Sequence, residues 1–168
     1  MSLTGQANYF EDFTVGDVYE HVRGRTVLHF DNYAVTHMSM NTAQAHFNLE
    51  YSRQMMGGAF PERLVVGPCT IGLVIGLTTE DMSENAFMDL GLTAIRLPSP
   101  VFAGDTLYAR SEVLEVADSP ERPDAGVMRY RFTGHKADGK VVAEGERIVL
   151  LKKRSHWAAR DAEARGAA

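Results

Sequence analysis

The residue best suited to proton transfer is His46, which lies in a polar segment that runs from Asn41 to Asn48. A histidine can accept and release a proton near neutral pH, and catalytic groups concentrate in loops held by regular elements. A histidine that satisfies a buried backbone carbonyl is the alternative, and residue type alone favours it. His46 is therefore a candidate general acid and base, and its surroundings must decide between a catalytic and a structural role.

The remaining chemistry-bearing residues predict neither a metal site nor a cofactor. Cys69 is the one cysteine, so an internal disulfide is excluded and a reducing compartment is expected. Near a helix N-terminus its thiol could be reactive, but a small buried packing residue is the stronger reading. The sequence lacks a nucleotide-binding glycine pattern, and metal-ligand spacing is lacking among the other histidines, His21, His29, His37, His135 and His156.

Length and charge narrow the class of protein further. The chain has 168 residues, which suits one domain, and a formal net charge of −5, which argues against nucleic acid or an anionic membrane as a partner. Residues Met1 to Asn8 lack an apolar leader, and the longest apolar run, Ile71 to Leu77, is too short to span a bilayer. We therefore expect a cytoplasmic protein.

The elements that must position His46 begin with a short strand at Val18 to Val22. Spacing of apolar residues predicts a helix over Thr26 to His37, with Asp31 and Asn32 as capping residues. One or two helical turns are expected over Leu49 to Met56, after the polar segment.

A second helix is predicted to begin at Gly67-Pro68, with glycine as its cap. Because it is apolar on all sides as far as Leu77, it should be buried. After this helix, apolar residues recur at every second position, which predicts four strands. These are Ala86 to Leu97, Thr106 to Val116, Val127 to Lys136 and Lys140 to Leu151.

An antiparallel sheet wrapped around the apolar helix is the simplest way to bury it, which gives an α+β fold. Residues 9–151 would form the core of this single domain, with the charged tail 152–168 as a surface helix or a frayed end. One sheet edge and one face would stay uncovered, so we expect two copies to pair as a homodimer or a multiple of one.

Three segments in this order resemble the MaoC-like family of hydratases, which have a hot-dog fold and include the (R)-specific enoyl-CoA hydratases. The segments are the one around His46, the helix start at Gly67, and Pro100 to Leu107. Met40 to Phe47 and Pro123 to Gly126 are similar to a subgroup that contains mesaconyl-CoA hydratases, also called methylmalyl-CoA dehydratases. The resemblance spans Tyr9 to about Leu151 and implies branched or carboxylated C4–C5 acyl-CoA substrates.

The chain departs from the family pattern at two positions. Asn41 stands where the wider family has an aspartate, and an amide cannot exchange a proton at neutral pH. Ile75 stands where the family has a serine. Because both polar groups are lost together, the two-residue acid–base mechanism cannot be carried over whole.

The mechanism that we expect from the remaining residues gives each candidate site residue a role. His46 would move the proton, Asn41 would orient water, and the N–H of Gly67, with that of Cys69, would bind the thioester oxygen. Glu50 could replace the missing carboxylate. Gln44 and Arg96 would contact substrate, although a solvated surface arginine is an equal alternative for Arg96.

Two other functions stay open. A hot-dog thioesterase needs a carboxylate near the buried helix, but residues 68–79 contain none and Glu80 follows too late. A non-catalytic subunit that binds acyl-CoA is compatible with Asn41.

Overall fold

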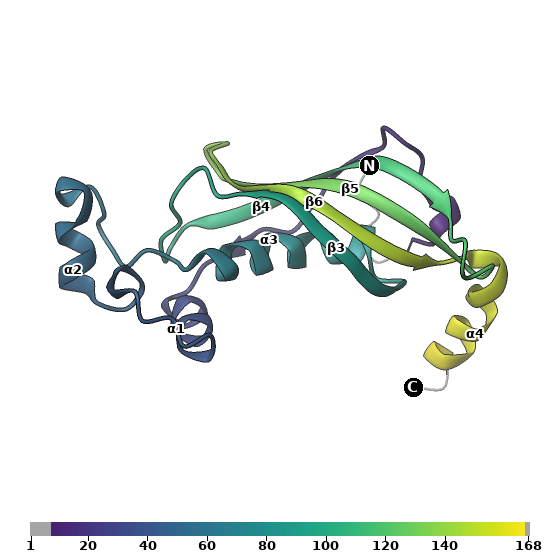
Figure 1. Cartoon of the computed structure of the whole chain (residues 1–168), viewed down its shortest axis with the longest axis horizontal. Helices are drawn as coiled ribbons and strands as arrows, with labels where there is room; N and C mark the ends of the chain where they lie inside the picture. Colours follow the sequence, from purple (N-terminus) through teal and green to yellow (C-terminus); the bar gives the residue numbers. More distant parts are fainter. Residues whose placement is uncertain (1–7, 167–168) are drawn as a thin grey trace.

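A curved antiparallel sheet lies over one helix, α3 (Gly67–Met82), in the computed structural model, which describes residues 8–166 (Figure 1). The sheet has the order β1-β4-β5-β6-β3, with β2 also paired to β4. Its strands are β1 (Val18–Glu20), β2 (Arg25–Thr26), β3 (Ala86–Arg96), β4 (Thr106–Asp118), β5 (Ala125–Lys136) and β6 (Val141–Lys152). The predicted α+β arrangement of a sheet around a helix is confirmed.

The core lies between α3 and the concave face of the sheet. Alternate residues of β4 and β5 point inward, among them Leu107, Tyr130 and Phe132, which are fully buried. The helix approaches β5 so closely that a Cβ on Gly134 would lie 2.3 Å from a methyl carbon of Val74. Glycine at this position therefore permits the helix to pack on the sheet.

α3 is only partly buried, so the prediction of a helix covered on all sides is wrong. Thr70, Val74 and Thr78 are buried on the side of the sheet, and Cys69 is buried near α1, whereas Gly72 and Gly76 are exposed. Apolar composition does not reveal what covers a face.

The N-terminal elements differ from the prediction at their boundaries. Arg25 and Thr26 form β2, and the first helix, α1, spans His29–Met38. Asp31 does cap it, because its carboxylate accepts the N–H of Leu28 at 2.7 Å. Asn32 does not cap, since its side chain is buried in the protein interior.

Helices gather at both ends of the sheet (Figure 1). At one end lie α1, the turns η2 (Gln44–His46) and η3 (Met55–Gly58), and α2 (Leu49–Gln54). At the other end lies α4 (Arg154–Gly166). The short turn η1 (Phe10–Asp12) is the first element of the described chain. Across residues 8–166, no helix is long and apolar enough to cross a membrane.

In the predicted tail, Lys152 is the last residue of β6, and an ordered helix, α4, begins at Arg154. Trp157 of α4 packs edge-on against Phe87 of β3 at 5.1 Å between ring centres, and its Nε1–H donates to Asp124 at 2.9 Å. The N-terminal residues 1–7 and residues 167–168 of the proposed domain lie outside the described part of the chain.

Candidate active site

A cleft of about 270 Å³ opens at the N-terminus of α3. Three walls enclose it: the η2 turn, the segment that leads into α3, and the loop after β3. Its lining residues are His46, Leu64, Val65, Gly67, Thr70, Leu97, Pro98, Ser99, Pro100 and Val101. The cleft therefore brings together His46 and Gly67, two of the residues predicted to act on substrate.

The imidazole of His46 is oriented by the segment that leads into α3. Nδ1 lies 2.8 Å from the carbonyl oxygen of Leu64. A carbonyl can only accept, so Nδ1 carries the proton and Nε2 is left with its lone pair. This tautomer gives the ring an acceptor nitrogen suited to a general base.

The N–H of Gly67 is the second reactive group of the cleft. Val66 caps α3 and Gly67 is its first residue, so the helix begins one residue earlier than predicted. Within residues 8–166, no acceptor receives the Gly67 N–H. The N-terminus of a 16-residue helix carries partial positive charge, which favours an oxyanion at this point.

Backbone hydrogen bonds connect the three walls of the cleft. The N–H of Leu64 donates to Ala45 at 3.0 Å, and that of Val65 donates to Val101 at 2.9 Å. These bonds connect the η2 turn, the entry to α3 and the loop after β3.

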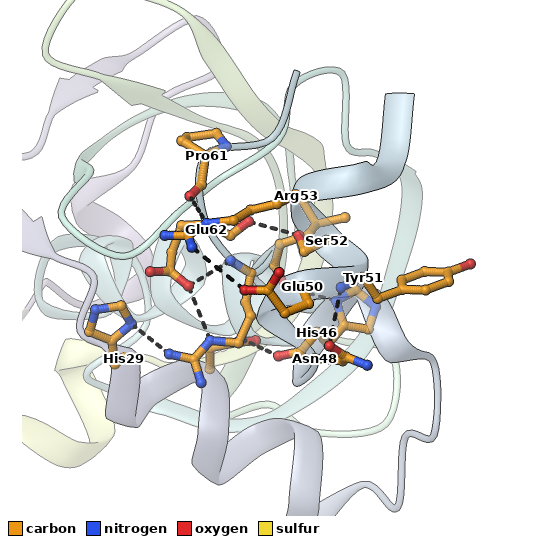
Figure 2. A network of polar contacts seen from close by, with 12 residues as sticks. His29, His46, Asn48, Glu50, Tyr51, Ser52, Arg53, Pro61 and Glu62 are labelled. Atoms are coloured by element: carbon orange, nitrogen blue, oxygen red, sulfur yellow. Dashed lines mark hydrogen bonds and ion pairs between the residues drawn. The ribbon is translucent and has the colours of Figure 1, made fainter. Parts of the chain in front are cut away.

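Polar contacts from α2 support the same entry segment (Figure 2). The hydroxyl of Ser52 donates to the Glu62 carbonyl at 2.8 Å, and Arg53 donates to the Pro61 carbonyl at 3.4 Å. Figure 2 also shows Tyr51 pointing away from this network. The predicted helical turns after His46 thus contact Pro61 and Glu62, which precede the residues of this segment that line the cleft.

Asn41 and Gln44 lie outside the cleft lining. Asn41 Oδ1 accepts the N–H of Ala43 at 2.9 Å, which stabilises the turn that leads to His46. Gln44 Oε1 accepts Nδ2 of Asn48 at 2.7 Å. Their predicted contacts with water and substrate stay predictions, and both side chains already shape the polar segment.

The structure does not bring Glu50 or Arg96 into the cleft. The Glu50 side chain is 78% exposed and lies 3.8 Å from Arg53. Arg96 is equally exposed, 3.9 Å from Glu144, in a separate hollow that it shares with Arg131. Both side chains are solvated in the structure, and the predicted roles of Glu50 as a replacement carboxylate and of Arg96 as a substrate contact gain no support from their positions.

Cys69 is also corrected, because its N–H already donates to Val66 at 2.9 Å and is unavailable to a substrate oxygen. Its side chain lines a different cavity, of about 230 Å³, between α1 and α3. Burial raises the pKa of the thiol, with Asp31 adding to the effect. The thiol is therefore a packing group, which is the interpretation that the sequence favoured.

Two hydroxyl residues of the cleft, Thr70 and Ser99, were not predicted. Thr70 is 3% exposed, and its hydroxyl makes no hydrogen bond to any other described residue. Its position three residues after Gly67 was the available signal, because such residues share a helix face. In the described part of the chain, no group of histidine, cysteine or acidic residues could hold a metal ion.

Comparisons of sequence identify the family of the chain. Residues 2–167 match the family model described as mesaconyl-CoA hydratase. The β-methylmalyl-CoA dehydratase of Chloroflexus aurantiacus is 36% identical over 131 residues, which cover 77% of this chain and 36% of that protein.

Solved structures show the same fold. One described as a MaoC domain protein dehydratase from Chloroflexus aurantiacus has 32% identity and a TM-score of 0.79, over 89% of this chain and 46% of that one. A Mycobacterium tuberculosis protein with a double hot-dog fold has 22% identity and a TM-score of 0.79, over 90% of this chain and 46% of its own. The chain therefore has the hot-dog fold and spans less than half the length of these relatives. It belongs to the mesaconyl-CoA hydratase family.

Proposed function

We propose that the chain reversibly hydrates an enoyl-CoA thioester to a 3-hydroxyacyl-CoA, with a branched or carboxylated C4–C5 acyl group such as mesaconyl-CoA. The observation that carries the proposal is the meeting, in one cleft, of a histidine with an acceptor Nε2 and a helix N-terminal N–H. Family membership supports the thioester class. We expect the reaction in the cytoplasm, because the single buried cysteine suits a reducing compartment.

The proposed mechanism uses His46 for both proton transfers. Nε2 takes a proton from water as the water oxygen bonds to C3, and the electron pair of the C2–C3 double bond moves toward the thioester oxygen. The N–H of Gly67 stabilises the charge on that oxygen. The imidazolium then delivers its proton to C2, where the enolate electron pair forms the C–H bond, and an electron pair on the oxygen re-forms the neutral thioester carbonyl. Thr70 lies in the same cleft, where its hydroxyl can hold the water that Asn41 was predicted to orient.

A second copy of the chain is part of the proposal. The sheet ends at β3, whose outer edge is unpaired within the described chain and carries exposed Met88, Leu90 and Leu92. An exposed apolar edge strand favours pairing with another strand. A homodimer would supply the second hot-dog unit that is present in the double hot-dog relative.

A thioesterase is the weaker alternative because the residues that line the cleft include no carboxylate. Asp81 is the buried carboxylate of α3, but it lies 14 residues beyond Gly67, about 21 Å along the helix. The lack of a lining carboxylate also suits a non-catalytic acyl-CoA-binding subunit, so the experiment must distinguish all three functions.

The test is to incubate the protein with crotonyl-CoA and with mesaconyl-CoA, and to follow both enoyl-thioester absorbance and free thiol. Loss of absorbance without thiol release supports the proposal. Thiol release would indicate a thioesterase, and binding without either change would indicate a non-catalytic subunit. His46→Ala should lower turnover at least ~100-fold, whereas the exposed His156→Ala serves as the control and should not.

A further inference from the structure

We propose that Asn32 is a positioning residue that fixes the general base relative to the oxyanion donor. Its side-chain amide joins the turn that carries His46 to the residue that precedes Gly67. The inference rests on the proposed function for its kinetic consequence, but the geometric part can be tested without it.

Asn32 lies on α1 and is 5% exposed. Its Nδ2 donates to the carbonyl oxygen of His46 at 2.8 Å, and its Oδ1 accepts the N–H of Val66 at 2.9 Å. Thr36 Oγ1, one turn later on α1, lies 3.3 Å from the same Oδ1 and donates to it. The partners leave one orientation for the amide, because a carbonyl only accepts and an N–H only donates.

The two contacts of Asn32 add to other hydrogen bonds that connect the His46 turn to the segment that leads into α3. His46 reaches the entry segment through Nδ1 to Leu64, and the turn reaches it again through Leu64 to Ala45. Asn32 adds the connection from the His46 backbone to Val66, the residue that caps α3. Because Gly67 follows Val66 directly, Asn32 controls how far the Gly67 N–H lies from the imidazole.

Few residue types could make both contacts at position 32. Asparagine carries an N–H donor group and a carbonyl acceptor together at the end of a short side chain. An aspartate would keep the acceptor for Val66 but would turn a second acceptor toward the His46 carbonyl. A leucine has a similar size and would lose both bonds.

The kinetic test compares Asn32→Leu and Asn32→Asp with Ser52→Ala, each at a temperature where the variant is folded. Ser52 is a matched control, because it loses one buried bond to the same entry segment, at Glu62, and touches neither His46 nor Val66. Both Asn32 variants should lower kcat for mesaconyl-CoA hydration by up to about 100-fold with KM little changed. Ser52→Ala should keep the wild-type kcat.

A second measurement is independent of activity. Nitrogen-15 NMR of the imidazoles should show His46 protonated at Nδ1 in the wild type and in Ser52→Ala, and a mixture of tautomers in Asn32→Leu. If the wild type does not hydrate enoyl-CoA but this shift occurs, the proposed function fails and the positioning role stands. An unchanged kcat together with an unchanged tautomer in Asn32→Leu would overturn the inference.

Discussion

His21, Asp81 and Ser111 form a buried chain of hydrogen bonds at the end of α3 remote from His46. Nδ1 of His21 lies 2.6 Å from Asp81, and Nε2 lies 2.8 Å from the Ser111 hydroxyl. The three residues have the order of groups found in nucleophilic hydrolases, but Ser111 is only 1% exposed and cannot meet a substrate in the closed fold. Their effect is structural: they tie the segment after β1 to α3 and β4.

This buried histidine predicts a pH dependence of stability. Burial lowers the pKa of His21 from 6.5, and Asp81 opposes the shift without reversing it. The unfolded state therefore binds the proton more readily, so the stability that neutral His21 contributes is present above pH 6.5 and is lost as the pH falls below it. Urea unfolding at about pH 7.5 and about pH 5.5 should show a smaller loss on acidification in His21→Gln than in the wild type. Equal losses would contradict the prediction, because His21 is the one histidine that differs between the two proteins.

His46 was identifiable from the sequence because its segment stands in order with Gly67 and Pro100-Val101. Asn32 was not, since its type and early place in α1 are typical of a helix cap. Its partners are 14 and 34 residues away, and only the folded chain brings them to it. The same holds for Glu50, whose spacing from His46 suits a helix, although the intervening backbone changes from η2 to α2.

At the scale of elements, the shape of the cleft depends on how closely α3 approaches the loop after β3. A Cβ on Gly67 would lie 2.8 Å from Cδ1 of Leu97, which lines the cleft. Gly67→Ala should therefore displace Leu97 and lower kcat/KM for hydration. The helix itself should not be destabilised, because alanine is a better helix former than glycine.

The displacement can be separated from a general defect with a double variant. Gly67→Ala combined with Leu97→Ala relieves the contact and should recover part of the activity lost by Gly67→Ala alone, with Leu97→Ala as the reference. Thermal unfolding of all three checks that they are folded. Absence of recovery would show that the added methyl group acts by another route.

The strands were more predictable than their surroundings. Period-two patterning placed β3 through β6 within a few residues of their observed bounds. The two-residue β2 was missed because so short a segment carries no period. How much of α3 is covered depends on the curvature of the sheet, which local patterning does not encode.

At the scale of the whole molecule, two apolar surfaces stay uncovered in a single copy. α3 lies against the concave side of the curved sheet, and β3 forms one edge of that sheet (Figure 1). A single copy thus leaves exposed an apolar strand edge and a helix face that the composition of α3 indicated should be buried. This arrangement is the physical basis for the proposed second copy.

Pairing through β3 predicts the effect of a charge on that strand. Leu92 is 47% exposed on β3, and a lysine there should oppose edge-to-edge association while leaving the core unchanged. Light scattering should report a dimer for the wild type and a monomer for Leu92→Lys, and hydration activity should fall with the mass if the second copy completes the site. Val15→Lys is the matched control, since Val15 is 56% exposed in the turn before β1, at the other edge of the sheet, and should keep both mass and activity. A wild type that is monomeric and fully active would show instead that the cleft of one copy suffices, because His46, Gly67 and Thr70 all come from the same chain.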